Sequence, residues 1–568
     1  MSWEPAWRLR GEQPPWAQAF ALLALAFSLL FILWMGRGTT FLEDEWAMIF
    51  GRRGWDLDTF FQPHNEHLVV VNVVAYKLLF ALAGLDHYLP YRLMVAVAHV
   101  AAVVLVFVLA RRRVGPWLAA ALTAPVLVFG PGWEILLFPF GIFFLGSTLA
   151  GLGMMLAFDR GDRRGDVAAS GLLGVALLGS SFGIPIALGA AAEILWRSDR
   201  LRRLWIVAVP VALYAIWYVA YDPGANRPVE RDVTEAPRFV LRAAQGAVSA
   251  FMGLPLGVET MNRPEHDLLM LVGYALLAVA LAALVRHLRR TRRITPRFAM
   301  VATTLGSFWV LTGIARGAEG QWYTGRYVYP AGILLVVLLA EVLQDVRIPR
   351  RAFAAVCVVA AGAALLNTGW LIKDGNGRRA DAGVLAAELA AVEVGGKWLR
   401  PEVEIDRKRA AGARVGEYLR TVDELGSPAL PLSELPAAPV DARRAADAVL
   451  VRGMRVVPLP RAPRPLFEQP VSGPAAAYGR ARLGCYEVRP PRGQLVTAML
   501  EPPPYGLAVS AADPASVVVR YRRFAPPPAT QPVKLLPGPA GTLIGAPPDG
   551  SKVPWSVEVA GRGRFTLC

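Results

Sequence analysis

The sequence predicts an α-helical protein that crosses a membrane many times and ends in a separate, β-rich domain. Of its 568 residues, 55% are hydrophobic and the mean hydropathy is +0.40, which is too apolar for a soluble protein of this length. The apolar residues form long runs before about Asp374, and short clusters of arginine separate these runs. After Asp374 the runs stop and Pro-rich, strand-like segments follow.

The apolar runs are long enough to cross a bilayer as helices, since one span needs roughly 20 apolar residues. The clear candidates are 17–35, 90–110, 115–131, 135–158, 203–221, 267–285, 297–315, 327–345 and 350–372. The segment 167–196 has turn residues at its centre and basic clusters on both sides, so it predicts a hairpin of two further helices. We therefore expect about eleven spans in a transmembrane domain of residues 1–375.

Arginine clusters orient these spans, because basic loops stay in the cytoplasm. The clusters are 111–113, 160–164, 197–203, 286–293 and 347–351. They predict a cytoplasmic N-terminus, an extracytoplasmic C-terminal domain, and three outer stretches. These are a first loop (36–88), a middle loop (222–266) and a late loop (316–326).

Two further predictions follow from the charge pattern. Residues 67–84 are predicted to form a helix in the outer membrane interface, because a span there would put cluster 111–113 outside. The clusters also account for the net charge of +16, and no basic stripe interleaved with aromatic residues indicates nucleic-acid binding.

The first loop opens with three consecutive acids, Glu43, Asp44 and Glu45. Their mutual repulsion is costly at a membrane surface unless a cation or a proton-transfer role offsets it. Asp44 and Glu45 are therefore candidate catalytic bases toward a hydroxyl acceptor, with Glu43 as a candidate substrate contact. The alternative is a helix start, where acidic residues favour the helix dipole.

A second polar motif in this loop consists of His64, Asn65, Glu66 and His67. These side chains suit a phosphate or another polar substrate, a metal ion, or the cap of the following helix. Their spacing is not a standard zinc pattern, so a divalent metal remains one alternative among three.

The late loop carries Arg316, Tyr323, Arg326 and Tyr327. A guanidinium at the outer membrane edge can grip a lipid-linked phosphate while aromatic rings lie at headgroup depth. Ordinary interfacial anchoring is the alternative. Arg92 enters a span from the outer side, either as a snorkelling residue or as a buried ion-pair partner, and is also a candidate substrate contact.

The order of these motifs resembles one family. Asp44-Glu45-Trp46 after a first span, a turn at Pro63 into an interfacial helix, Tyr91-Arg92, and Arg326-Tyr327 before a late span are similar to the membrane-embedded glycosyltransferases of the C superfamily (GT-C). The resemblance is to their protein O-mannosyltransferase and aminoarabinose-transferase-like branch. It covers residues 15–372, and the turn at 63–67 departs from the family's Lys-Pro-Pro-like sequence.

The resemblance implies an integral membrane hexosyl- or pentosyltransferase. Such enzymes move a sugar from a polyprenyl-phosphate donor to an envelope glycan, lipid or protein on the outer face. Asp44 would be the base and Arg326 would lie near the donor phosphate. Because the phosphate leaves already ionised, one base suffices and a single displacement with inversion is expected. A transporter or flippase of lipid-linked glycans is the alternative function, and a non-catalytic envelope scaffold is a third.

The C-terminal domain, 376–568, is predicted to be mixed α/β and β-rich after about residue 448, ending as a β-sandwich. The strand-like segments are 449–457, 485–489, 516–524 and 555–559. Cys485 and Cys568 are predicted to form a disulfide in an oxidising compartment, with two unpaired thiols as the alternative. The domain either binds the acceptor glycan, braces the late loop, or packs without a ligand.

Overall fold

The computed structural model describes residues 15–568 apart from 225–232, 255–265, 293, 321, 345, 347, 461–477, 481–484, 491–495, 501–505, 528–531, 537–539, 546–550 and 552. Arg293 and Arg347, at the ends of two arginine clusters, and two segments of the middle loop thus lie outside the described residues. The chain forms two compact units. The helical unit contains the chain up to Arg37, Arg52–Ala81 and Leu89–Arg378, and the terminal unit contains Gly38–Gly51, Leu82–Tyr88 and Arg379–Cys568.

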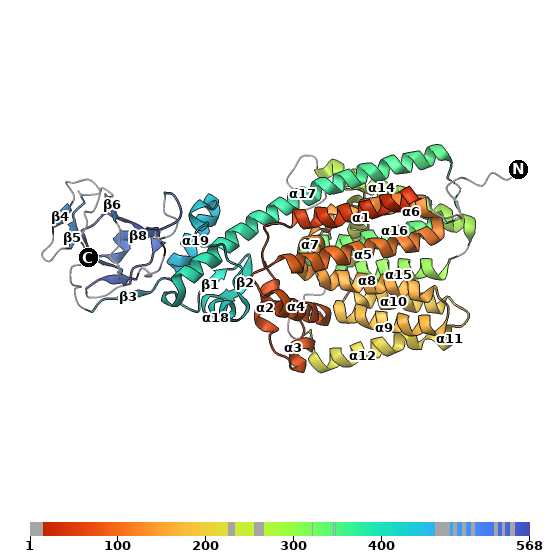
Figure 1. Ribbon diagram of the computed structural model, residues 1–568, viewed down its shortest axis with the longest axis horizontal. Helices are drawn as coiled ribbons and strands as arrows, with labels where there is room; N and C mark the ends of the chain where they lie inside the picture. Colours follow the sequence, from red (N-terminus) through yellow and green to blue (C-terminus); the bar gives the residue numbers. More distant parts are fainter. Residues whose placement is uncertain are drawn as a thin grey trace. The chain divides into compact units, whose positions relative to one another are not determined.

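The helices from the first span to the end of the helical unit follow the predicted apolar runs closely (Figure 1). They are α1 (Pro15–Met35), α3 (Leu57–Phe61), α4 (Val70–Ala83), α5 (Leu89–Val114), α6 (Pro116–Thr123), α7 (Trp133–Leu136), α8 (Ile142–Phe158), α9 (Arg163–Gly179), α10 (Gly183–Leu195), α11 (Arg200–Arg203), α12 (Trp205–Tyr221), α13 (Ala236–Phe251), α14 (His266–Thr291), α15 (Pro296–Arg316), α16 (Gly325–Leu343) and α17 (Arg350–Gly395).

Among the described residues, seven helices are long and apolar enough to cross a membrane, or eight if the bent pair Pro116–Val128 and Gly130–Leu136 counts as one span. Three shorter apolar helices are Val70–Ala83, Gly183–Leu195 and Trp205–Tyr221. The predicted class, a helical multi-pass membrane protein with a β-rich C-terminal region, is confirmed. The total of eleven spans and the orientation of the termini stay predictions.

The core of the helical unit lies where α8 packs between α5 and α9, and where α15 and α16 pack against α13. Large apolar side chains such as Phe129, Phe158 and Tyr329 are fully buried there. By contrast, α1 and α14 expose most of their apolar surface, for example Phe20 and Leu271. Such continuous apolar faces suit contact with lipid rather than water.

An ion-pair network joins five helices at one end of this unit, which we call the network end. Arg297 contacts Glu193 (Nε to Oε2, 3.0 Å) and Asp159 (Nη2 to Oδ1, 3.0 Å). Arg112 contacts the other oxygen of Asp159 at 2.8 Å, and Arg113 pairs with Glu341. Clusters 111–113, 160–164 and 197–203 adjoin these residues, so three of the five loops predicted to share one side of the membrane lie at the same end of the unit.

The predicted hairpin at 167–196 is present as α9 and α10, joined by a turn at Gly179–Gly183. Both helices contact the network end, through Asp166 with Arg203 (3.6 Å) and through Glu193 with Arg197 (2.6 Å). The middle loop contains one helix that the sequence analysis did not predict, α13, which packs on α15 and α16.

The terminal unit is β-rich, as predicted. It contains α2 (Glu45–Gly51), α18 (Val415–Leu425), α19 (Val440–Gly453), and strands β1 (Glu404–Asp406), β2 (Ala410–Arg414), β3 (Val456–Pro458), β4 (Tyr478–Arg480), β5 (Tyr486–Val488), β6 (Val496–Leu500), β7 (Leu507–Ala511), β8 (Val517–Arg522), β9 (Pro532–Val533), β10 (Thr542–Ile544), β11 (Ser556–Gly561) and β12 (Phe565–Leu567). Two antiparallel sheets have the orders β3-β10-β7-β12-β5-β4 and β6-β11-β8-β9. The predicted strand at 449–457 is wrong over its first half, because α19 continues to Gly453.

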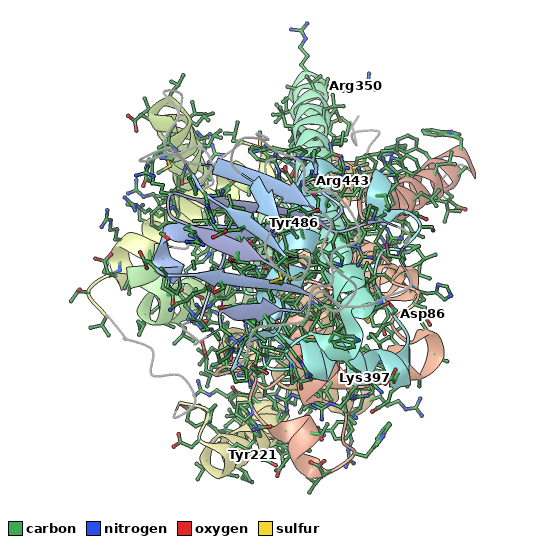
Figure 2. All side chains as sticks on the ribbon, turned by 90° about the vertical axis from the view of Figure 1, so that its left-hand side faces the viewer. Asp86, Tyr221, Arg350, Lys397, Arg443 and Tyr486 are labelled. Carbon is green, nitrogen blue, oxygen red and sulfur yellow. A yellow bond between two sulfur atoms is a disulfide. The ribbon has the colours of Figure 1, made fainter. Side chains whose placement is uncertain are left out.

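The disulfide between Cys485 and Cys568 is confirmed (Figure 2). The two Cα atoms lie 4.6 Å apart, and the backbone of Cys568 exchanges hydrogen bonds of 2.8 and 2.9 Å with Ala508. The last residue of the chain is thereby fixed to the six-stranded sheet.

Candidate active site

The first-loop motif folds as a tight turn in the helical unit. The backbone N–H of His64 donates to the carbonyl of His67 (2.9 Å), and the N–H of His67 donates to the carbonyl of His64 (3.0 Å). Asn65 adopts a φ of 54°, which asparagine tolerates better than most residues. The turn directs Glu66 and His67 toward two other segments of the chain.

Glu66 connects this turn to the late loop. Its carboxylate forms an ion pair with Arg316, whose other nitrogen contacts Glu319 at 2.9 Å. Arg316 is 9% exposed and stands at the end of α15, the helix that begins beside Arg297 at the network end. With 21 residues, α15 separates these two ends by roughly 30 Å.

His67 connects the same turn to the α9–α10 hairpin, because its Nδ1 lies 2.6 Å from the hydroxyl of Ser181. Enclosure by protein atoms is the main reason that the pKa of His67 falls to about 4, and the guanidiniums of Arg316 and Arg326 lower it further. Glu66 acts in the opposite direction but does not outweigh burial. The ring is therefore uncharged at neutral pH, although 26% of the side chain remains accessible.

Arg326 and Tyr327 lie in the first turn of α16. The backbone N–H of Arg326 donates to Glu134 Oε2 (3.2 Å), and its guanidinium carbon lies 5.4 Å from the centre of the Tyr327 ring. Tyr327 packs in turn between Phe144 and Phe308. A cation thus lies beside an aromatic cluster at the mouth of a predicted span.

We call this region the loop end, defined by turn 63–67, Ser181 and the late loop 316–326. The sequence analysis missed Ser181 in this region and two charged residues outside it, Glu134 beside Arg326 and Arg378 beside Trp133. Ser181 lies in a segment read only as a turn, Glu134 between the predicted spans 115–131 and 135–158, and Arg378 beyond the last predicted span. The buried Arg378 guanidinium lies over the rings of Trp133 (4.6 Å) and Phe138 (5.1 Å).

Two residues predicted to contact the substrate instead donate hydrogen bonds to backbone carbonyl groups. Arg92 donates through Nη1 to the carbonyl of Leu33 (3.2 Å), near the C-terminus of α1, where a cation favours the helix dipole. The hydroxyl of Tyr323 donates to the carbonyl of Leu254 (2.8 Å) after α13. Both side chains therefore tie helix ends together.

The acidic triplet belongs to the terminal unit and divides into two kinds of residue. Glu45 is fully buried, and its Oε2 accepts from the backbone N–H of Leu42 (3.0 Å) and the hydroxyl of Tyr88 (2.7 Å). It stands at the first position of α2, as the helix-start interpretation requires. Glu43 and Asp44 have exposed side chains in the turn before α2.

The described side chains do not form a metal centre. In the described part of the chain, no three His, Cys, Asp or Glu side chains converge as ligands. Glu66 is engaged by Arg316, and His67 faces Ser181. The donor set of the 63–67 turn therefore does not fit a metal ion.

Comparison with known proteins finds no matching family model and no matching curated protein. Two crystal structures of ArnT from Cupriavidus metallidurans are structural neighbours, one bound to undecaprenyl phosphate and one in the apo state. Both are 16% identical to this chain, and each match covers 71% of this chain and 85% of the other. The TM-scores are 0.45 and 0.46 respectively.

Proposed function

We propose that the chain is a membrane glycosyltransferase that moves a sugar from a polyprenyl-phosphate donor to a hydroxyl of a cell-envelope glycan, lipid or protein. The observation that carries this proposal is the loop end of the helical unit. There Arg316 and Arg326 accompany an uncharged His67 and an aromatic cluster, at the end of an apolar bundle. A lipid-linked anion needs apolar surface for its chain and guanidinium groups for its phosphate.

Arg326 is the proposed phosphate ligand. Glu66 and Glu319 already hold Arg316, so that guanidinium fixes the late loop to the 63–67 turn. The Arg326 guanidinium lies against the ring of Tyr327, and the backbone N–H of Arg326 donates to Glu134. Its position in the first turn of α16 adds the positive end of a helix dipole, which also favours an anion.

Asp44 is the proposed base. Its exposed carboxylate would take the proton of the acceptor hydroxyl, whose oxygen attacks the anomeric carbon as the bond from that carbon to the phosphate oxygen breaks. The electron pair of the broken bond leaves on the phosphate, so a general acid is not needed. The transfer would proceed on the outer face with inversion. Glu45 would support this step only by fixing the start of α2.

A flippase is the second candidate function, favoured by the bent pair Pro116–Val128 and Gly130–Leu136, which turns by 48°. Interrupted helices of this kind are common in transporters. The experiment that separates the two functions uses purified protein in vesicles with polyprenyl-phosphate sugars and a mixture of envelope acceptors. A transferase consumes the donor and releases polyprenyl phosphate. Movement of intact donor across the bilayer without consumption would instead identify a flippase.

A further inference from the structure

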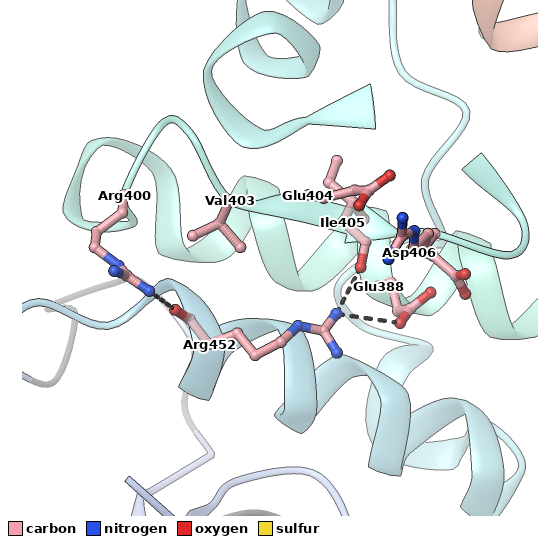
Figure 3. A pocket seen from close by; sticks show the side chains of 8 residues that line it. Glu388, Arg400, Val403, Glu404, Ile405, Asp406 and Arg452 are labelled. Carbon is pink, nitrogen blue, oxygen red and sulfur yellow. Dashed lines mark hydrogen bonds and ion pairs between the residues drawn. The ribbon is translucent and has the colours of Figure 1, made fainter. Parts of the chain in front are cut away.

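The terminal unit contains a pocket of about 510 Å³ that the proposed transferase site does not use (Figure 3). This volume lies within the ~300–1,000 Å³ range of small-molecule sites. Its walls come from the C-terminal part of α17, from β1 with the segment before it, and from α19. The lining residues are Glu388, Arg400, Val403, Glu404, Ile405, Asp406, Arg407 and Arg452.

The cations at this pocket are held in place by backbone carbonyl groups. Arg452 Nη2 donates to the carbonyl of Ile405 (2.6 Å) and lies 4.0 Å from Glu388 Oε1. Arg400 Nη2 donates to the carbonyl of Arg452 (2.7 Å). Because 39% of the Arg452 side chain remains exposed, it keeps donor capacity for a ligand.

Two carboxyl groups meet at this site. Asp406 Oδ1 accepts from the backbone N–H groups of Lys408 (2.7 Å) and Arg409 (2.9 Å), and Oδ2 accepts from the Arg409 guanidinium (2.9 Å). Glu388 is only 4% exposed, and within the described chain no N–H or O–H group donates to its Oε2. Two neighbouring carboxyl groups can join only through a shared proton.

That proton belongs to Glu388, which lies beyond the apolar stretch of α17. Burial, followed by the hydrogen bond to Asp406 and the negative charge of Asp406, raises the pKa of Glu388 to about 9. Burial opposes ionisation of Asp406 as well. However, the hydrogen bonds from Glu388, Arg409 and Lys408 outweigh it and hold the pKa of Asp406 below its usual value. At neutral pH the pocket thus contains the neutral carboxyl of Glu388, the ionised Asp406, the side chain of Glu404 and three arginine side chains.

We propose that this pocket binds a neutral saccharide unit through its hydroxyl groups. The carboxylates of Glu404 and Asp406 would repel an anionic ligand. The three arginines would repel a cationic one, so the pocket favours a neutral ligand. Sugar hydroxyls both donate and accept hydrogen bonds, and so they match the alternating donors and acceptors around the pocket. The proposal goes beyond the transferase function and does not depend on it, because binding can be measured without a lipid-linked donor.

The test measures sugar binding to the full chain in lipid nanodiscs, since alkyl glycoside detergents carry sugar headgroups. Glucose, mannose, galactose and N-acetylglucosamine are titrated to about 20 mM, well above the dissociation constant of a weak, millimolar site. At least one should bind saturably and resist competition by inorganic phosphate. Arg452→Ala should weaken binding on the order of tenfold or more. Arg444→Ala, on the same helix but outside the pocket lining, should leave it unchanged.

Glu388→Gln provides a second readout that a purely structural role would not change. Asp406, Arg409 and Arg452 are the charged groups that act on Glu388. Wild-type affinity should therefore fall as the pH rises through about 9, where Glu388 loses its proton. The Gln variant should bind at pH 7 and lack this dependence. Binding of phosphate in place of the sugars, no binding of any of the four sugars, or identical pH profiles for wild type and variant would overturn the proposal.

Discussion

The two ends of the helical unit contain similar charged residues in different surroundings. At the network end, arginines lie directly against carboxylates, as in the contacts of Arg297 with Glu193 and Asp159. At the loop end, Arg316 also pairs with carboxylates, but the guanidinium of Arg326 lies 5.4 Å from the centre of the Tyr327 ring, and the partly buried His67 stays uncharged. The comparison suggests that the network end holds helices together, whereas the loop end is arranged to receive an anionic ligand.

The largest expected effect concerns the proposed base, Asp44. Asp44→Asn keeps the size and polarity of the side chain but removes its basicity, so sugar transfer should fall by roughly 10²–10⁴-fold. Donor binding should persist. Donor consumption and donor affinity measure the two quantities separately.

Glu43→Gln is the matched control, because Glu43 is an exposed acid in the same turn. It should retain far more transfer than Asp44→Asn. If Asp44→Asn is active while Glu43→Gln is not, the base is Glu43. Normal transfer by both variants and by Glu66→Gln would contradict the proposed mechanism.

Substituting one arginine at each end tests the comparison itself. Arg297→Gln removes one of the two arginines that contact buried Glu193 and leaves only Arg197, so the free energy of unfolding should fall by up to about 3–5 kcal/mol. Arg326→Ala should instead weaken donor binding by about 2–5 kcal/mol with little loss of stability. Thermal unfolding measures the stability of each variant, and donor titration measures the donor affinity of each variant.

Arg160→Ala serves as the control for these substitutions. Arg160 pairs with Asp162 at 3.0 Å near the network end, but 55% of its side chain is exposed, so its removal should leave stability nearly unchanged. If Arg297→Gln and Arg326→Ala had equal effects on stability and on donor affinity, the proposed difference in role between the two ends would be contradicted.

The stability of the terminal unit should depend on its disulfide, whereas the stability of the helical unit should not. Cys485→Ser opens a bridge between residues 83 positions apart, which should destabilise the terminal unit by about 2–4 kcal/mol. Cys357→Ser is the control, because Cys357 is an exposed free thiol on α17. Denaturant unfolding monitored in the terminal unit provides the measurement, and equal stability of the two variants would contradict this role.

The smallest expected effect is a pH dependence at the loop end. The pKa of His67 is about 4 in the folded protein and about 6.5 when unfolded, so the unfolded chain binds the proton more readily. His67 thus favours folding above pH 6.5, and this contribution is lost as the pH falls toward 4. Between pH 7.5 and 6 the loss should be about 1 kcal/mol. His67→Asn should flatten this part of the stability curve, and an unchanged curve would argue against a neutral His67 ring.

The sequence alone was sufficient for the fold class, because apolar runs, arginine clusters and strand-like segments are local patterns. It also placed the hairpin at 167–196 and paired Cys485 with Cys568 correctly. The strand prediction was wrong at 449–453. Val449 and Val451 have a high preference for strands, but in the structure they are buried residues of α19.

The candidate site was less accessible to sequence reasoning, since its contacts join residues far apart in the chain. Glu66 and Arg316 are 250 positions apart, and His67 and Ser181 are 114 positions apart. No local pattern marks Ser181 or Arg378 as neighbours of a polar site. Glu45 is buried, whereas its neighbour Asp44 is exposed. A run of three acidic residues in the sequence does not reveal which of them is buried.

Photo-crosslinking with a polyprenyl-phosphate analogue tests the central claim most directly, because it locates the donor phosphate on the helical unit. A reactive group placed next to the phosphate should label peptides of the 63–67 turn and of the segment around Arg326 and Tyr327. Excess natural donor should suppress this labelling, and Arg326→Ala should reduce it. Specific labelling confined to peptides that contain Arg112, Asp159 or Arg297 would contradict the assignment of the loop end as the donor site.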